Sequence, residues 1–143
     1  REYLAGKYQE LELNGILLEA DMPEQPIFCQ IDKGLFYRAL DNLVQNSQAY
    51  GGPNITIFFS VKQENGQAVI ILGDNGVGIS EELAEKIFQP FVTGDASRSG
   101  GHGSGLGMSI VKQIVTLHGG KISLKRKPWP GCSIQFLITL PLA

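Results

Sequence analysis

Cysteine, histidine and long apolar runs are all scarce in this chain of 143 residues. Its two cysteines, Cys29 and Cys132, lie far apart and outside any Cys-x-x-Cys pair, which disfavours a disulfide framework or a zinc site. They are interpreted as two reduced thiols. No apolar run approaches the roughly 18 residues that cross a bilayer, so we expect no membrane contact by this domain.

An excess of charge of either sign is also missing. The chain carries 12 basic and 14 acidic residues, and its longest basic run is residues 125–127, so a nucleic-acid partner is not expected. The length fits one domain, residues 1–143, which can bury roughly 70% of its unfolded surface. A helical pattern is already present at Arg1, which is not a methionine, so we expect a fragment of a longer protein.

Paired strands alternate with helices along the chain. The strand at 68–72 is apolar on both faces, which predicts a central position in the sheet. This order predicts an α+β sandwich, a mixed sheet covered on one face by helices. The expected elements are a helix in 1–14, a hairpin of strands 15–20 and 27–31, a helix at 33–50, two strands within 55–75, helices at 80–88 and 105–118, and strands at 121–127 and 132–140.

Two asparagines share one side of the predicted helix 33–50. Asn42 and Asn46 are four residues apart, at the edge of an apolar stripe that includes Leu43 and Ser47. Asparagine is unfavourable within a helix, so the pair indicates amide oxygens that coordinate a hard cation. Solvated or capping asparagines are the alternative.

A carboxylate follows the predicted central strand in the stretch ILGDNGVGIS. Asp74 is half buried on this interpretation and needs donors, while Gly76 and Gly78 remove side chains beside it. A purine could place its ring against this backbone and its exocyclic amine on Asp74. An ordinary Asp-Asn-Gly turn is the alternative.

A glycine-rich loop, GDASRSGGHGSGLGMS, leads into the predicted helix at 105–118. Free backbone N–H groups at a helix N-terminus suit a polyphosphate, and Gly103, Gly105 and Gly107 would let it approach. The spacing is neither the dinucleotide fingerprint nor a Walker A box, and a solvated loop would explain the glycines equally well. His102 is either a phosphate contact or an incidental imidazole, and His118 is expected to cap the helix end.

Four segments in order resemble the catalytic, ATP-binding domain of bacterial sensor histidine kinases, within the GHKL superfamily of DNA gyrase B, HSP90 and MutL. DNLVQNSQAY resembles the N-box, DNGVGI the G1 box, IFQPF the F-box, and GGHGSGLGMSIVKQIVTLHGGKISL the G2 box. The resemblance covers nearly the whole chain. It implies the GHKL (Bergerat) fold: a two-layer α/β sandwich with about five main strands, three helices on one face and a flexible ATP lid.

The same resemblance implies an ATP site. Asn46 would bind Mg²⁺ beside the phosphates, Asn42 would line the catalytic site, and Asp74 would accept from the adenine amine. The other implied ATP-binding residues are Tyr50, Gly76, Gly78, Ile79, Gly103, Ser104, Gly105, Leu106 and Gly107.

The chain departs from the family pattern at three positions. Ser47 and Ala49 stand where Ala and Lys are usual in the N-box, and Thr93 stands near the usual F-box Arg. Arg98 and His102 are therefore candidate replacements as phosphate contacts. The adenine pocket is unaffected by these departures.

The activity implied is phosphoryl transfer from Mg·ATP to a histidine, followed by transfer to a response-regulator aspartate in a two-component system. The acceptor histidine would lie in a separate domain before Arg1. Gyrase-like ATPases carry a Glu at position 42, and the Asn42 amide cannot act as that base, so hydrolysis should be slow. A nucleotide-responsive interaction module without catalysis, and an anti-sigma-type serine kinase, are the alternatives.

The resemblance also bears on assembly and location. The isolated domain is expected to be a monomer in the bacterial cytoplasm. The full-length protein is expected to be anchored in the inner membrane.

Overall fold

The computed structural model describes residues 1–91 and 107–143, which form a five-stranded sheet and four helices. No helix in this described part is long and apolar enough to span a bilayer. The elements are α1 (Glu2–Leu13), β1 (Leu17–Asp21), α2 (Lys33–Gly51), β2 (Thr56–Glu64), β3 (Gln67–Asp74), α3 (Glu81–Lys86), α4 (Gly107–Leu117), β4 (Lys121–Trp129) and β5 (Cys132–Pro141).

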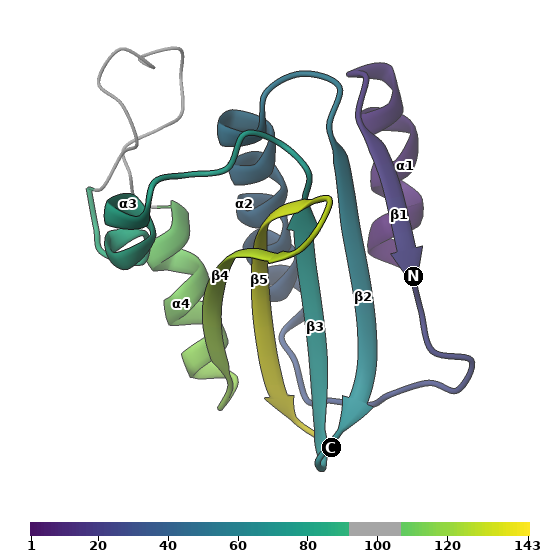
Figure 1. Cartoon of the computed structure of the whole chain (residues 1–143). Coiled ribbons are helices and arrows are strands. Elements are labelled where there is room, and N and C mark those ends of the chain that lie inside the picture. The colour runs from purple at the N-terminus through teal and green to yellow at the C-terminus, as the bar shows by residue number, and fades with distance from the viewer. Residues whose placement is uncertain (92–106) are drawn as a thin grey trace.

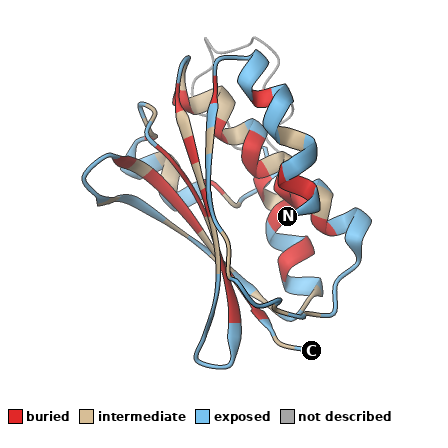
Figure 2. Cartoon of the chain, turned by 90° about the vertical axis from the view of Figure 1, so that its right-hand side faces the viewer, coloured by how far each residue is buried: buried red, intermediate tan, exposed pale blue. Residues whose placement is uncertain are grey.

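The sheet is mixed and has the order β1-β2-β3-β5-β4. β1 pairs in parallel with β2, and every other pairing is antiparallel. The three longer helices, α1, α2 and α4, lie against one face of the sheet and leave the other open (Figure 1, Figure 2). The predicted two-layer fold is confirmed, with β3 in the middle as its apolar sequence indicates.

One predicted strand is wrong. Residues 27–31 form no strand, and Phe28 in this stretch is 69% exposed. Pro23 and Pro26 lack backbone donors, which disfavours a ladder with β1. β1 instead pairs with β2, which the chain reaches after crossing over through α2. Residues 22–32 are thus a connection between β1 and α2.

Capping residues fix where the helices begin and end. Asp32 accepts from the backbone of Leu35 at the start of α2, and Ser80 accepts from Leu83 at the start of α3. His118 follows α4; its Nδ1 lies 2.7 Å from the Ile114 carbonyl and its Nε2 accepts from the Asp32 backbone. The predicted capping role of His118 is confirmed, and the same ring joins the end of α4 to the start of α2.

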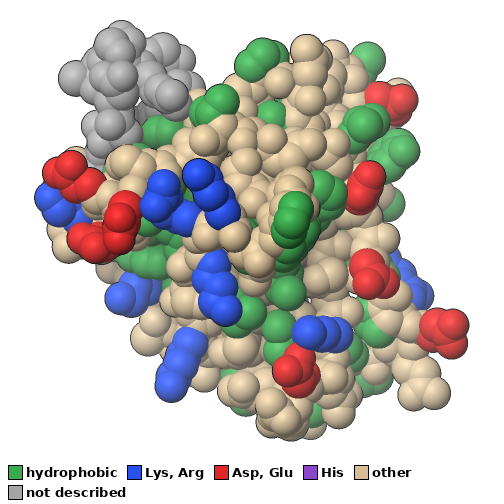
Figure 3. Space-filling model, viewed as in Figure 1, with side chains coloured by type: hydrophobic (Ala, Val, Ile, Leu, Met, Phe, Trp, Pro, Cys, Tyr) green, Lys and Arg blue, Asp and Glu red, His purple; other side chains and the backbone are tan. Residues whose placement is uncertain are grey.

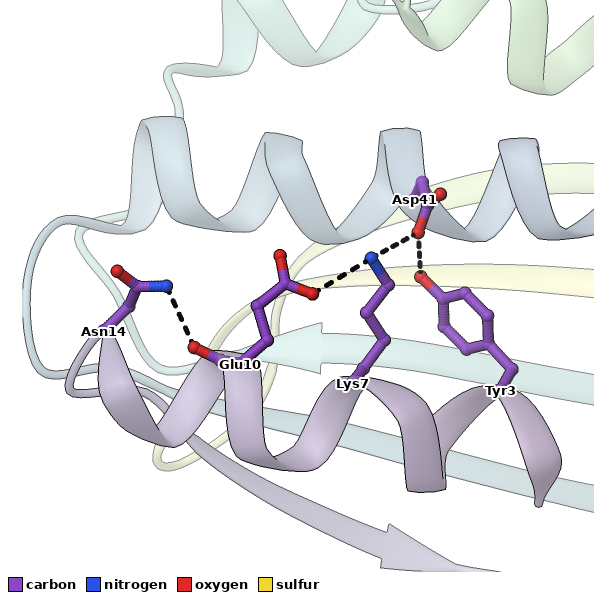
Figure 4. Close-up of polar contacts among 5 residues, drawn as sticks. All are labelled: Tyr3, Lys7, Glu10, Asn14 and Asp41. Atoms are coloured by element: carbon purple, nitrogen blue, oxygen red, sulfur yellow. Dashed lines mark hydrogen bonds and ion pairs between the residues drawn. The ribbon is translucent and has the colours of Figure 1, made fainter.

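A polar network fixes α1 against α2 (Figure 4). The Tyr3 hydroxyl donates to Asp41 at 2.7 Å, and the Lys7 ammonium lies 3.0 Å from the same carboxylate. Glu10 lies 3.4 Å from Lys7 on the outer side. Because Asp41 precedes Asn42, this network positions the helix that carries the asparagine pair.

The pH dependence of the stability of Tyr3→Phe tests this network. Burial and the neighbouring Asp41 carboxylate raise the pKa of Tyr3 well above its ordinary value. Above pH of about 10 the unfolded chain loses this proton and the folded chain keeps it, so the wild type loses about 1.4 kcal/mol of stability per pH unit from this residue. We expect Tyr3→Phe to be about 1–3 kcal/mol less stable at pH 7 and the difference to shrink above pH 10.

Urea unfolding between pH 7 and 11 measures this difference. Tyr8→Phe is the matched control, because Tyr8 lies on the same helix and is 54% exposed. A Tyr3→Phe deficit that is the same at pH 7 and pH 11 would contradict the assignment.

The open face of the sheet is charged at its edges. Figure 3 shows basic side chains over β4 on one side and acidic side chains over β1 on the other. Lys121 and Lys125 are exposed on β4, and Glu19 and Asp21 are exposed on β1. Charged side chains on edge strands disfavour pairing with other chains.

Candidate active site

Asp74 ends the central strand and is buried more deeply than the sequence predicts, with 1% of its surface exposed. One carboxylate oxygen, Oδ1, accepts from the Gly76 backbone N–H at 3.0 Å. Burial raises the pKa of Asp74, while the Gly76 amide and the nearby Ser47 hydroxyl oppose the rise. The Asp74 carboxylate can therefore still accept a hydrogen bond from a bound ligand.

The end of α2 and the loop after β3 are in direct backbone contact. The Val77 N–H donates to the Gly51 carbonyl at 3.1 Å. A Cβ on Gly76 would overlap the Gly51 backbone, and one on Gly51 would lie 3.7 Å from Asp74 Oδ1. Gly76 is therefore required by packing, while Gly78 has φ of +76°, a conformation that favours glycine.

The β4–β5 hairpin holds the same loop from the other side. The Ser133 hydroxyl donates to the Gly76 carbonyl, and Arg126 Nε donates to the Ile79 carbonyl at 2.9 Å. Both residues were missed by the sequence analysis, because nothing local in their segments indicates a partner so far away in the chain. They position the loop that carries Gly76 and Gly78.

The two asparagines of α2 differ in their contacts. Asn42 Nδ2 donates to the Gly107 carbonyl at 3.2 Å, which joins α2 to the first residue of α4 and leaves the amide oxygen as an acceptor. The Asn46 side chain has no hydrogen-bond partner among residues 1–91 and 107–143 and is half buried. Both the oxygen and the nitrogen of the Asn46 side-chain amide are thus available to a ligand, as far as residues 1–91 and 107–143 are concerned.

Ser47 lies next to Asn46 on the buried side of α2. It is 1% exposed, as its place on the predicted apolar stripe requires. Its hydroxyl oxygen is the one buried side-chain polar atom without a hydrogen-bond partner in the described part of the chain. Ser47 and Gly51, one turn apart, both lie near the Asp74 carboxylate.

The remaining predicted residues divide into two groups. Tyr50 packs against the core at the end of α2, and Ile79, the last residue of the DNGVGI stretch, is buried. Arg98, His102, Gly103, Ser104, Gly105 and Leu106, with Thr93, lie outside the described residues. The described structure thus brings the end of α2 and the loop after β3 together around Asp74, and the start of α4 against Asn42.

Comparison with known families agrees with this geometry. Residues 31–143 match the family described as histidine kinase-, DNA gyrase B-, and HSP90-like ATPase. The chain belongs to this ATPase family. The matched range includes Asp74, both asparagines of α2 and the whole of α4.

Curated relatives of this chain include a sensor protein and a sensor histidine kinase. The chain is 36% identical over 106 residues to the sensor protein GtcS of Aneurinibacillus migulanus, a match covering 74% of this chain and 28% of that protein. It is 31% identical over 134 residues to the sensor histidine kinase YcbM of Bacillus subtilis, covering 93% and 42%. The chain thus spans less than half the length of these two relatives.

Solved structures support the same fold. The catalytic domain of the histidine kinase ThkA superposes with a TM-score of 0.81 at 27% identity, covering 99% of this chain and 88% of that one. ThkA in complex with the response regulator protein TrrA gives a TM-score of 0.78 at 26% identity, covering 100% of this chain and 39% of that one. This ATPase domain is of the histidine-kinase catalytic type.

Proposed function

We propose that this domain binds ATP with Mg²⁺ and transfers the γ-phosphate to a histidine on a separate phosphoacceptor domain of the same full-length protein. A response-regulator aspartate would receive the phosphate next. The observation that carries the proposal is the packing of α2 against Asp74 through Ser47 and Gly51, which sets the asparagine helix beside a buried acceptor. The complex of ThkA with TrrA supports the response regulator as the next partner.

The residues present fit a metal ion that arrives with the nucleotide. Among the described residues no three His, Cys, Asp or Glu side chains form a metal cluster, and Asn46 offers a single unpartnered amide oxygen. Mg²⁺ typically combines one or two protein oxygens with phosphate oxygens and water. When bound, it would neutralise phosphate charge during transfer.

The chain's own residues orient the nucleotide. Asp74 would accept from the exocyclic amine of adenine, and Gly76 would present bare backbone next to the ring. Asn42 would hold the start of α4, whose N-terminal end favours negative charge, at the phosphates. Since Asn42 cannot remove a proton from water, the phosphate would remain available for a histidine nucleophile.

Phosphotransfer to an added acceptor domain tests the activity. The domain, ATP and Mg²⁺ are incubated with a purified phosphoacceptor domain, and acid-labile, base-stable phosphate is measured. We expect phosphohistidine to form only with all four components. Tight ATP binding without any phosphohistidine would instead favour the nucleotide-responsive interaction module.

The Asn46→Ala variant tests whether Asn46 contributes to ATP binding through the metal ion or through a contact that does not need it. We expect Mg²⁺ to strengthen ATP binding to the wild type, and the variant to lose about tenfold in ATP affinity with Mg²⁺ but to match the wild type in EDTA. Calorimetric titration in both buffers measures this, with exposed Gln45→Ala on the same helix as control. Equal loss in Mg²⁺ and in EDTA would show that Asn46 does not act through the metal.

A further inference from the structure

A small cavity on the open face of the sheet shares no residue with the site around Asp74. Its volume is about 260 Å³, and its lining includes Glu19, Asp21, Phe58, Ser60, Ile71 and Trp129. Figure 3 shows hydrophobic side chains on this face beside the acidic side chains over β1. Pockets for drug-sized ligands occupy roughly 300–1,000 Å³, so this cavity is suited to a single small group.

Two aromatic rings meet at this cavity because the end of β4 is bent. The register of β4 with β5 shifts between Arg126 and Trp129, and Lys127 in this interval has φ of +51°. A bulge of this kind turns the strand and redirects the side chains that follow it. The Trp129 ring lies with its centroid 6.3 Å from that of Phe58 on β2, at an interplanar angle of 61°. The two rings therefore form adjoining walls that meet edge to face.

Two carboxylates on β1 lie beside the aromatic walls. Glu19 is in register with Phe58 and Asp21 with Ser60, so both carboxylates lie on the same face of the sheet as the Phe58 ring. They are two residues apart, which is about 6–7 Å along a strand. Both are exposed, and neither forms an ion pair within residues 1–91 and 107–143. Lys62, two residues after Ser60, is instead paired with Glu64 at 2.9 Å.

We propose that this cavity binds one guanidinium group between the rings of Phe58 and Trp129 and the carboxylates of β1. The faces of aromatic rings attract cations, and a planar guanidinium can stack on a ring while its N–H groups donate to carboxylates. An ammonium is more strongly hydrated and has no plane to stack, so it fits this site less well. Arginine side chains and small guanidino compounds both carry the required group.

Titration of the isotope-labelled 143-residue chain with methylguanidinium, followed by NMR, tests the proposal. We expect saturable shifts in the amide signals of β1 and β2 and in the indole signal of Trp129. Methylammonium should bind about tenfold more weakly, and N-methylurea, a neutral molecule of nearly the same shape, should cause no saturable shift. The absence of saturable shifts with methylguanidinium, or equal binding of methylammonium or N-methylurea, would overturn the proposal.

A capped arginine, N-acetyl-arginine methylamide, distinguishes the two sources of the group. If it binds more tightly than methylguanidinium, the site takes an arginine side chain of a protein. If it binds equally or more weakly, the site takes a small guanidino compound.

Variants of the cavity locate the binding. Glu19→Gln and Asp21→Asn should each weaken methylguanidinium binding about three- to tenfold, and Trp129→Leu should do the same if its urea midpoint matches the wild type. Glu12→Gln is the matched control, because Glu12 is exposed on α1, which covers the opposite face of the sheet. Wild-type affinity in both carboxylate variants, or an equal loss in Glu12→Gln, would overturn the assignment to this cavity.

Discussion

Asp74→Asn is expected to weaken ATP binding by about ten- to a hundredfold and, at the same time, to stabilise the nucleotide-free domain. The loss of affinity follows from removing a charged acceptor for the adenine amine, which contributes about 1.5–3 kcal/mol. The gain in stability follows from burial, which raises the pKa of Asp74 and so disfavours the ionised carboxylate in the folded state. Titration of Mg·ATP and urea unfolding of the apo protein measure the two effects.

The stability effect has a defined pH dependence. Because the folded pKa of Asp74 is raised, its contribution is favourable below the ordinary pKa of an aspartate and is lost as pH rises through the raised value. Asp74→Asn does not titrate, so its advantage over the wild type should be larger at pH 7 than at pH 4. Exposed Asp21→Asn on β1 controls for the removal of a charge. An apo Asp74→Asn protein that is less stable than the wild type at pH 7 would contradict this account of the carboxylate.

The central part of the fold could be predicted because its local pattern is strong. A strand apolar on both faces can only be interior, so the position of β3 and of Asp74 at its end followed from residues 68–74 alone. The capping role of His118 was likewise a local signal. The stretch 27–31 has the same apolar character, but its pairing depended on a partner strand, and β1 pairs with β2 instead.

Contacts between distant segments could not be predicted from single residues. The glycines of the loop after β3 were interpreted as leaving space for a purine ring, whereas Gly76 also packs against Gly51. Ser133 and Arg126 hold this loop from a hairpin much later in the chain. Ser47 was expected on the buried stripe, but its unpaired hydroxyl could be seen only after α2 had been placed on β3.

Gly76→Ala is expected to destabilise the domain by about 3 kcal/mol or more and to abolish ATP binding although Asp74 is unchanged. The added methyl group would overlap the backbone of Gly51, which cannot rotate away as a side chain could. Moving the loop would also break the bonds from Val77 to Gly51 and from Gly76 to Asp74. Urea unfolding followed by the fluorescence of Trp129, the chain's one tryptophan, measures the loss.

Two other glycine variants separate this steric effect from backbone conformation. Gly66 has φ of +75° with open space around its α-carbon, so Gly66→Ala should cost about 1–2 kcal/mol from conformation alone. Gly6 lies inside α1 with nothing near a new Cβ, so Gly6→Ala should stabilise by about 0.5–1 kcal/mol. The φ of Gly76 is not in the left-handed region, so its larger loss must come from contact with Gly51. A loss at Gly76 no greater than that at Gly66 would mean that α2 and the loop after β3 can separate without unfolding, and the geometry around Asp74 would then not be fixed by this contact.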